Sequence, residues 1–168
     1  MTTNQMNFMI GQYVVYPTHG VGEITDIETQ QVAGITLEMF VIHFKRDKMT
    51  LRVPTHRAAA AGLRSISDAH SIEKAIKTLR GRAKTSRGMW SRRAQEYEAK
   101  INSGNIIQLA EVVRDLHKNV DQSERSYSER MIYESALGRL AGELAIANDV
   151  EHQEAASELL LVLRKTAA

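Results

Sequence analysis

The hydrophobic and polar residues of this chain follow two different periods. Residues 8–66 switch between apolar and polar over short runs, which is typical of half-buried β-strands. The predicted strands are residues 13–16, 21–27, 37–44 and 49–54. Four or five short strands in fewer than 60 residues leave no room for crossover helices. This half of the chain is therefore predicted to form a small antiparallel β-barrel of SH3 or Tudor type.

The run at residues 49–54 alternates most regularly. Its first face comprises Met49, Leu51 and Val53. Thr50 and Arg52 face the other way, and Pro54 ends the strand because proline has no N–H for a ladder. We interpret Leu51 and Val53 as core, which leaves Arg52 as the better candidate for contact with a partner.

Glycine and polar residues predict the turns of this half. Gly34 marks one turn, and the polar residues 45–48 mark another. Residues 20–22, Gly-Val-Gly, are also predicted to be a turn. They look like part of a phosphate-binding loop, but the third glycine and the following helix are missing. We therefore assign no phosphate site to them.

From about residue 69 the apolar residues recur every three or four positions, which predicts helices. Ser71 is the predicted N-cap of the first helix. A second helix is expected over about residues 91–103, with Gly104 as its end. Asn105 is expected to cap a third helix.

Ser126 and Glu129 form a capping box that predicts the start of a fourth helix. Its expected apolar stripe is Met131, Leu137, Leu140, Ala141 and Leu144. Asn148 or Asp149 is predicted to begin a last helix. The second half is therefore expected to be a compact all-α domain of about five helices.

These periods predict an α+β protein with two domains, residues 1–66 and 67–168. The chain has no cysteine, which fits a reducing compartment. No apolar run approaches the roughly 20 residues that cross a bilayer. The first residues lack the basic and apolar regions of a signal peptide. We expect a soluble, cytoplasmic monomer that does not associate with membranes.

Charge is distributed unevenly, although the net charge is only +2. Residues 74–100 carry 9 basic and 2 acidic side chains, a balance of +7. Residues 101–168 carry 7 basic and 11 acidic side chains, a balance of −4. A basic block of this size indicates a polyanionic partner, although a solvated helix face is the simpler alternative.

The single tryptophan, Trp90, lies inside the basic block, between Arg87 and the pair Arg92–Arg93. An exposed indole beside cations is typical of a nucleic-acid contact. The alternative is that Trp90 anchors a helix start in the core while the arginines point to solvent. Burial of the arginines themselves is disfavoured, because the nearby sequence offers no acid to pair with them.

The sequence carries no recognisable catalytic motif. The six histidines are scattered and do not show the spacing of metal ligands. Nucleophile-elbow and Walker A motifs are absent. We therefore predict a protein that is not an enzyme and that binds no cofactor, metal or small-molecule substrate.

Four segments of the chain are distinctive: residues 14–22, 49–54, 90–93 and 111–116. Together they resemble the CarD family of bacterial transcription regulators, and most closely its CdnL branch. Residues 14–22 (VVYPTHGVG) resemble the opening of the family's N-terminal domain. Residues 49–54 (MTLRVP) resemble its barrel strand. Residues 90–93 (WSRR) and 111–116 (EVVRDL) resemble two signatures of its helical domain. The matches follow the family's order and spacing over the whole chain.

The resemblance implies a Tudor-like barrel that binds the RNA polymerase β subunit, joined to a helical DNA-binding domain. The matching positions for polymerase are Met49, Arg52 and Pro54. For DNA they are Trp90, Arg92 and Arg93, with the tryptophan wedged into the minor groove at the upstream edge of the −10 element. The family fold thus implies promoter binding, stabilisation of the open complex and association with the nucleoid.

One departure from the family pattern concerns the residues after the tryptophan motif. Some relatives have a further basic residue there, where this chain has Gln95-Glu96. We therefore expect DNA binding to depend also on the other cations of the basic block. These are Arg82, Lys84 and Arg87.

Three other functions remain open at this point. The main alternative is a nucleic-acid or chromatin module that acts without polymerase. A second is an RNA-binding barrel, which would use exposed aromatic residues such as Tyr13, Tyr16 or Phe40. An enzyme is the third, because residues distant in sequence can still form a site.

Overall fold

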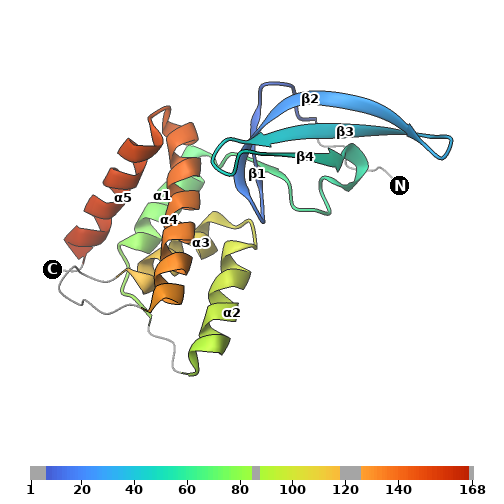
Figure 1. Ribbon diagram of the computed structural model, residues 1–168. Helices are drawn as coiled ribbons and strands as arrows, with labels where there is room; N and C mark the ends of the chain where they lie inside the picture. The colour runs from blue at the N-terminus through green and yellow to red at the C-terminus, as the bar shows by residue number, and fades with distance from the viewer. Residues whose placement is uncertain (1–6, 85–87, 118–125, 167–168) are drawn as a thin grey trace. The chain divides into compact units, whose positions relative to one another are not determined.

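The computed structural model describes residues 7–84, 88–117 and 126–166. The chain separates into two compact units, Met1–Ile66 and Ser67–Ala168. The first contains an antiparallel sheet and the second contains helices, so the predicted α+β class with two parts is confirmed (Figure 1).

The sheet unit has five strands in the order β4-β3-β2-β1-β5. The elements are β1 (Tyr13–Tyr16), β2 (Gly20–Val32), β3 (Ile35–Phe44), β4 (Met49–Pro54), the 3₁₀-helix η1 (Thr55–Arg57) and β5 (Arg64–Ser65). All neighbouring strands pair antiparallel, and Figure 1 shows β2 and β3 as the longest of them. Strand β4 has the predicted bounds, and its partly buried Met49 and Leu51 pack on the core, as its alternation indicated.

Strand β2 is longer than predicted because it continues through polar residues. It pairs with β3 as far as Val32↔Ile35, and Ala33 and Gly34 form the turn. Both turn residues have positive φ, 53° and 78°, as a two-residue hairpin requires. The strands of this hairpin tip are exposed, so they do not show the apolar pattern of a half-buried strand.

The expected turn at residues 20–22 is wrong, because these residues begin β2. Gly22 pairs with Val14 inside the sheet. A Cβ atom at Gly22 would lie 2.6 Å from Ile42 Cγ2 and 2.8 Å from Phe44 Cε1. Glycine is therefore needed for the close approach of two core side chains, not for phosphate binding.

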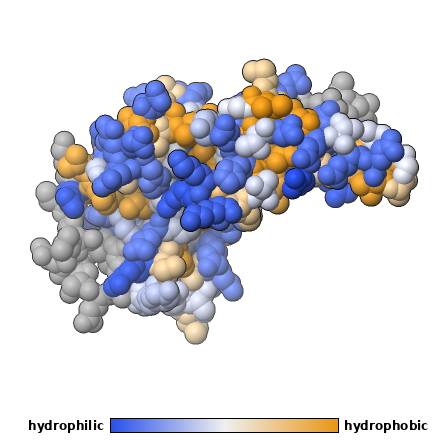
Figure 2. Space-filling view, turned by 45° about the horizontal axis from the view of Figure 1, so that its top comes forward, coloured by the Kyte–Doolittle hydropathy of each residue, from blue (hydrophilic) through white to orange (hydrophobic). Residues whose placement is uncertain are grey.

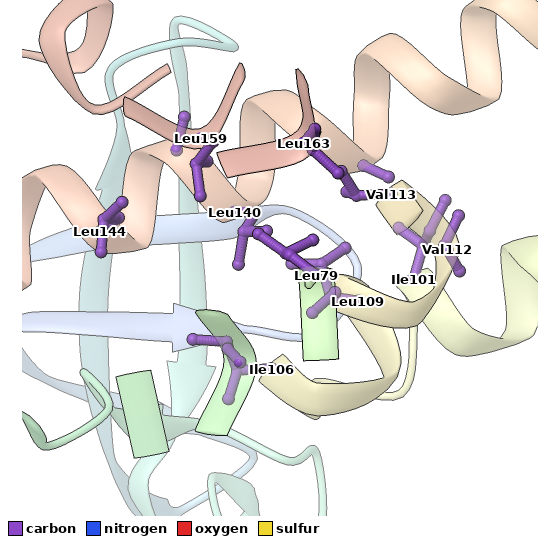
Figure 3. Close-up of a cluster of buried hydrophobic side chains, with 14 of the residues drawn as sticks. Leu79, Ile101, Ile106, Leu109, Val112, Val113, Leu140, Leu144, Leu159 and Leu163 are labelled. Carbon is purple, nitrogen blue, oxygen red and sulfur yellow. The ribbon is translucent and has the colours of Figure 1, made fainter. Parts of the chain in front are cut away.

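The helical unit has five helices within the described residues. They are α1 (Ala69–Leu79), α2 (Trp90–Ile101), α3 (Ile106–Leu116), α4 (Tyr127–Asn148) and α5 (His152–Thr166). Buried side chains from all five converge in one cluster (Figure 3). Its labelled members include Leu79 of α1, Ile101 of α2, Leu140 of α4 and Leu159 of α5.

Two predicted N-caps are confirmed. The Asn105 side chain accepts hydrogen bonds from the backbone N–H groups of Ile107 and Gln108, at 2.8 and 3.2 Å. The Ser126 hydroxyl accepts a bond from the Glu129 N–H at 3.1 Å. These bonds satisfy N–H groups that the first turn of a helix leaves without intrahelical partners.

Two predicted helix starts are wrong. Asp68, rather than Ser71, caps α1, because the Asp68 carboxylate accepts the Ser71 N–H at 2.8 Å. Asp149 does not begin α5. It ends α4 in the left-handed conformation, with φ 53°, and α5 starts at His152.

The predicted stripe of α4 is wrong at one position. Met131 is exposed, and its neighbour Ile132 enters the core instead. Leu140, Ala141 and Leu144 are buried as expected. The stripe is therefore offset by one residue in the first turns of this long helix.

Apolar surface occurs in small patches between hydrophilic residues on the face shown in Figure 2. Over the described residues, no helix combines the length and the hydropathy that a membrane crossing demands.

Candidate contact sites on the two units

Trp90 is the first residue of α2 and is partly buried against the helical core. Its Nε1–H donates to the Ser128 hydroxyl of α4 at 3.3 Å. The guanidinium of Arg93 lies over the ring, 5.5 Å from its centroid, and the Tyr97 ring centroid is 6.3 Å away. The indole is thus neither sealed in the core nor free in solvent, so each of the two sequence interpretations describes part of its surface.

The two arginines after Trp90 have different surroundings. The Arg92 side chain is 83% exposed and lies 3.7 Å from Glu96, one turn along α2. The expectation that no nearby acid could pair with these arginines is therefore wrong for Arg92. The Arg93 Nη2 group donates to the Tyr97 hydroxyl at 3.4 Å, and its Nε is buried without a hydrogen-bond partner in the described residues. Of these two arginines, only Arg92 has a largely exposed side chain.

The connector between α1 and α2 comprises residues 80–89, of which residues 80–84 and 88–89 are described, and it is bound to α3 at Lys84. Arg82 and Lys84 are exposed. The backbone N–H of Lys84 donates to Asp115 Oδ1 at 2.9 Å, and the same oxygen accepts from Arg114 Nε at 2.8 Å. Arg87, the third predicted cation of the connector, lies outside the described residues.

The predicted signature at residues 111–116 has a structural explanation. Val112, Val113 and Leu116 are buried in the helical core. Glu111 pairs with Lys100 of α2 at 2.8 Å, while Asp115 holds the connector. Among the described residues, the segment therefore packs into the core, pairs with the end of α2 through Glu111 and binds the backbone of Lys84 through Asp115.

The candidate residues of the sheet unit all lie on β4. Arg52 is exposed, whereas Met49 packs partly against the core and Pro54 is partly buried. Arg52 spans β3 to reach Glu28 on β2, with Nε–Oε2 at 3.0 Å and Nη2–Oε1 at 3.4 Å. Hydrogen bonding from Arg52 lowers the pKa of Glu28, and Glu28 raises the pKa of Arg52. The candidate contact residue is therefore already fixed in a two-bond ion pair.

Sequence reasoning missed three residues that hold these side chains. Tyr97 could have been found, because it lies four positions after Arg93 on one helix. Glu28 is 24 residues from Arg52, and Ser128 is 38 residues from Trp90. No local pattern connects such distant positions, so only the strand register and the helix packing bring them together.

The aromatic residues considered for an RNA-binding barrel do not form one exposed group. Phe40 is 3% exposed and belongs to the core. Tyr16 is partly buried and stacks on His19, while Tyr13 is exposed. Within the described residues, no cluster of three or more His, Asp or Glu side chains could hold a metal ion.

Comparison with known proteins matches both units. Residues 8–67 match the CarD-like/TRCF RID domain, and residues 74–160 match the CarD C-terminal domain. The chain is also similar to "Putative transcription factor YdeB" of Bacillus subtilis (strain 168). That similarity is 27% identity over 147 residues, which cover 88% of this chain and 96% of the relative. With both domain types matched in order over most of its length, this chain belongs to the CarD family.

Proposed function

We propose that this chain is a transcription regulator that binds the RNA polymerase β subunit through residues 1–66 and promoter DNA through residues 67–168. Bound at the upstream edge of the −10 bubble, it stabilises the open complex. The family membership and the similarity to a protein named as a transcription factor support this proposal. It assigns no catalytic role, cofactor or metal to the chain, which acts as a cytoplasmic, nucleoid-associated monomer.

The observation that carries the DNA part of the proposal is the position of Trp90. A partly buried indole stands at the start of α2, and the exposed Arg92 follows two residues later. Arg82 and Lys84 add exposed cations on the connector. An apolar wedge with flanking cations fits the minor groove, where side chains inserted between base steps unstack and kink the duplex.

The energies limit what this chain does alone. A wedge at one step offsets only a few kcal/mol of unstacking. Opening a bubble breaks many steps at about 1.4 kcal/mol each. The protein therefore biases an equilibrium that polymerase sets. A tether through the sheet unit raises the effective concentration of the helical unit to about the mM range, so weak DNA contacts suffice.

Replacement of the wedge tests the DNA part. Trp90→Ala is expected to bind polymerase as the wild type does and to leave open-complex lifetime at the value for polymerase alone. The lifetime is measured by competitor challenge of preformed complexes, and circular dichroism checks that the helical unit stays folded. Wild-type lifetime with Trp90→Ala would refute the wedge. Equal binding of the wild-type protein to any duplex, with no dependence on polymerase, would favour the independent nucleic-acid module.

Charge exchange at the sheet tests the polymerase part. Arg52→Glu is expected to abolish binding to the β subunit in a pull-down, because rim charges must match across an interface. This variant also places two acids together, since Glu28 faces position 52. The double variant Arg52→Glu, Glu28→Arg restores the ion pair with its polarity reversed. Binding that returns in the double variant would show that Arg52 supports the sheet and does not contact polymerase.

A further inference from the structure

We propose that Arg93 and Ser128 are positioning residues that hold the Trp90 indole in one orientation before DNA is bound. This inference rests on the proposed role of Trp90 as a DNA wedge. The two neighbouring arginines then have different roles. Arg92 contacts a phosphate, and Arg93 supports the ring. Arg93, Tyr97 and Ser128 together are named the indole cradle.

Ser128 joins the starts of two helices. It is the second residue of α4, and its hydroxyl accepts the Nε1–H of the first residue of α2 at 3.3 Å. The indole has only this one hydrogen-bonding group, so the bond fixes which edge of the ring faces the protein. The first turn of α4 is itself fixed by the Ser126 cap and by the buried Glu129 side chain. The acceptor therefore stands on a rigid support.

Arg93 covers the ring from within α2. Its guanidinium lies 5.5 Å from the Trp90 centroid and 5.9 Å from the Tyr97 centroid. A guanidinium stacks on aromatic faces and is attracted by their negative surface. The bond from Nη2 to the Tyr97 hydroxyl fixes the fork, and the buried Nε is withdrawn from solvent. These interactions suit a group that supports the indole better than one that reaches for phosphate.

Arg92 provides the contrast on the same turn. Its side chain is largely exposed, and its acid neighbour Glu96 is also exposed. Such a pair is weak and exchanges readily for a phosphate. The two arginines therefore offer matched variants that change one charge each and differ in their interaction with Trp90.

A ring held in advance gives up less conformational freedom when it enters DNA. Ordering a free side chain on binding opposes association. Because the indole cradle already orders the ring in the free protein, that part of the entropy loss does not occur on DNA binding. Substitution of one cradle residue is therefore expected to mobilise Trp90 while the exposed cations proposed to contact DNA, Arg92, Arg82 and Lys84, stay in place.

The first experiment uses the protein alone and exploits its single tryptophan. We measure fluorescence anisotropy, acrylamide quenching and the one indole N–H peak in a ¹H–¹⁵N spectrum. Ser128→Ala and Arg93→Gln should each lower the anisotropy of Trp90 and raise its quenching constant relative to the wild type. Ser128→Ala should also shift the indole N–H peak, because its acceptor is removed. The matched controls, Ser135→Ala on α4 and Arg92→Gln on α2, should match the wild type.

The second experiment measures affinity for a short promoter duplex as a function of salt. Arg92→Gln should reduce the slope of log K against log salt by about 0.9, the value for one phosphate contact. Arg93→Gln should keep the wild-type slope and weaken binding by about fivefold, which corresponds to the net stabilisation from one hydrogen bond. A slope reduced equally by both variants would overturn the assignment of Arg93.

Unchanged anisotropy, quenching and indole N–H signals in Ser128→Ala and Arg93→Gln would overturn the inference. Melting curves check the fold, and Tyr97→Phe keeps the buried ring while removing only the hydroxyl that accepts from Arg93. That variant should mobilise Trp90 in the same direction and to a smaller extent. The fluorescence and NMR results on the protein alone test the positioning of Trp90. The open-complex lifetime of Trp90→Ala tests the proposed function, so failure of one can be told from failure of the other.

Discussion

The sheet unit and the helical unit hold their candidate contact residues by different physical means. In the sheet unit, Glu28 fixes Arg52 through an exposed ion pair. In the helical unit, Ser128 and Arg93 fix Trp90 through one neutral hydrogen bond and stacking. Salt screens the exposed ion pair strongly and the partly buried contacts of Trp90 much less. The geometry of one candidate site therefore depends on solution conditions, and the geometry of the other depends on packing.

The cores of the two units also differ, in the kind of substitution that destabilises each of them. The sheet core is small, and Ile42 and Phe44 pack so close to the backbone of Gly22 that a side chain at this position would collide with them. The helical core takes side chains from all five described helices. Overpacking is therefore the direct way to break the first unit, and a cavity is the direct way to break the second.

The largest expected effect comes from a cavity in the helical unit. Leu159→Ala removes a fully buried side chain of α5, a helix that packs against α4 and α1, and should lower the free energy of unfolding by about 2–5 kcal/mol. Denaturant titration followed by Trp90 fluorescence measures it, because this residue reports on the helical unit alone. Leu161→Ala, two residues along the same helix and 54% exposed, should change the value by less than about 0.5 kcal/mol. Equal effects of the two substitutions would contradict the burial of Leu159 in the helical core.

A smaller effect is expected from overpacking the sheet. Gly22→Ala places a methyl group against Ile42 and Phe44 and should cost about 1–3 kcal/mol. Amide exchange in β2 and β3 should accelerate, while the Trp90 transition stays at the wild-type midpoint. Thr36→Ala, an exposed change on β3, is the control. A shift of the Trp90 transition with Gly22→Ala would mean that the two units do not unfold independently.

The smallest effect concerns pH and sharpens the comparison. Arg52 lowers the pKa of Glu28, and the Ser71 backbone N–H lowers the pKa of Asp68 at the start of α1. A carboxyl group whose pKa falls on folding adds stability above its unfolded pKa, and this is lost as the pH falls through the folded value. Both units should therefore lose stability below the usual range of carboxyl pKa values.

Substitution and salt separate the two contributions. Glu28→Gln should reduce the acid loss of the sheet unit and leave that of the helical unit unchanged. High salt should weaken the Glu28 contribution more than that of Asp68, because an exposed ion pair carries the first and the Ser71 backbone hydrogen bond is the largest cause of the second. Thermal unfolding from about pH 7 to pH 3 measures both, with Glu38→Gln as the exposed control on β3. An unchanged acid profile in Glu28→Gln would contradict the role of the ion pair.

Local patterns predicted those parts of the fold that local physics decides. The alternation at residues 49–54 and the caps at Asn105 and Ser126 are confirmed, because each depends on neighbours within a few positions. Ser71 was the wrong cap because Asp68 lies three residues earlier and accepts the Ser71 N–H itself. The end of β2 was missed because a solvated hairpin has no apolar face to alternate.

The candidate site was predicted as a set of residues, not as a geometry. The family resemblance singled out Trp90, Arg92 and Arg93 alike, yet the structure gives the two arginines different neighbours. That difference follows from the Tyr97 hydroxyl and from the arrival of α4 beside α2. The Arg93–Tyr97 contact follows the i, i+4 spacing of one helix, whereas the Trp90–Ser128 bond depends on packing between distant segments that no local spacing encodes.

The bond between Asp115 and the connector reaches the backbone of residue 84 rather than its side chain. Any amino acid except proline supplies that N–H group. Position 84 is consequently free to gain or lose charge across relatives while its backbone hydrogen bond to Asp115 stays the same. Asp115 has no such freedom, because one carboxylate oxygen serves both the connector and Arg114. We expect related sequences to vary at position 84 and to keep the acid at position 115.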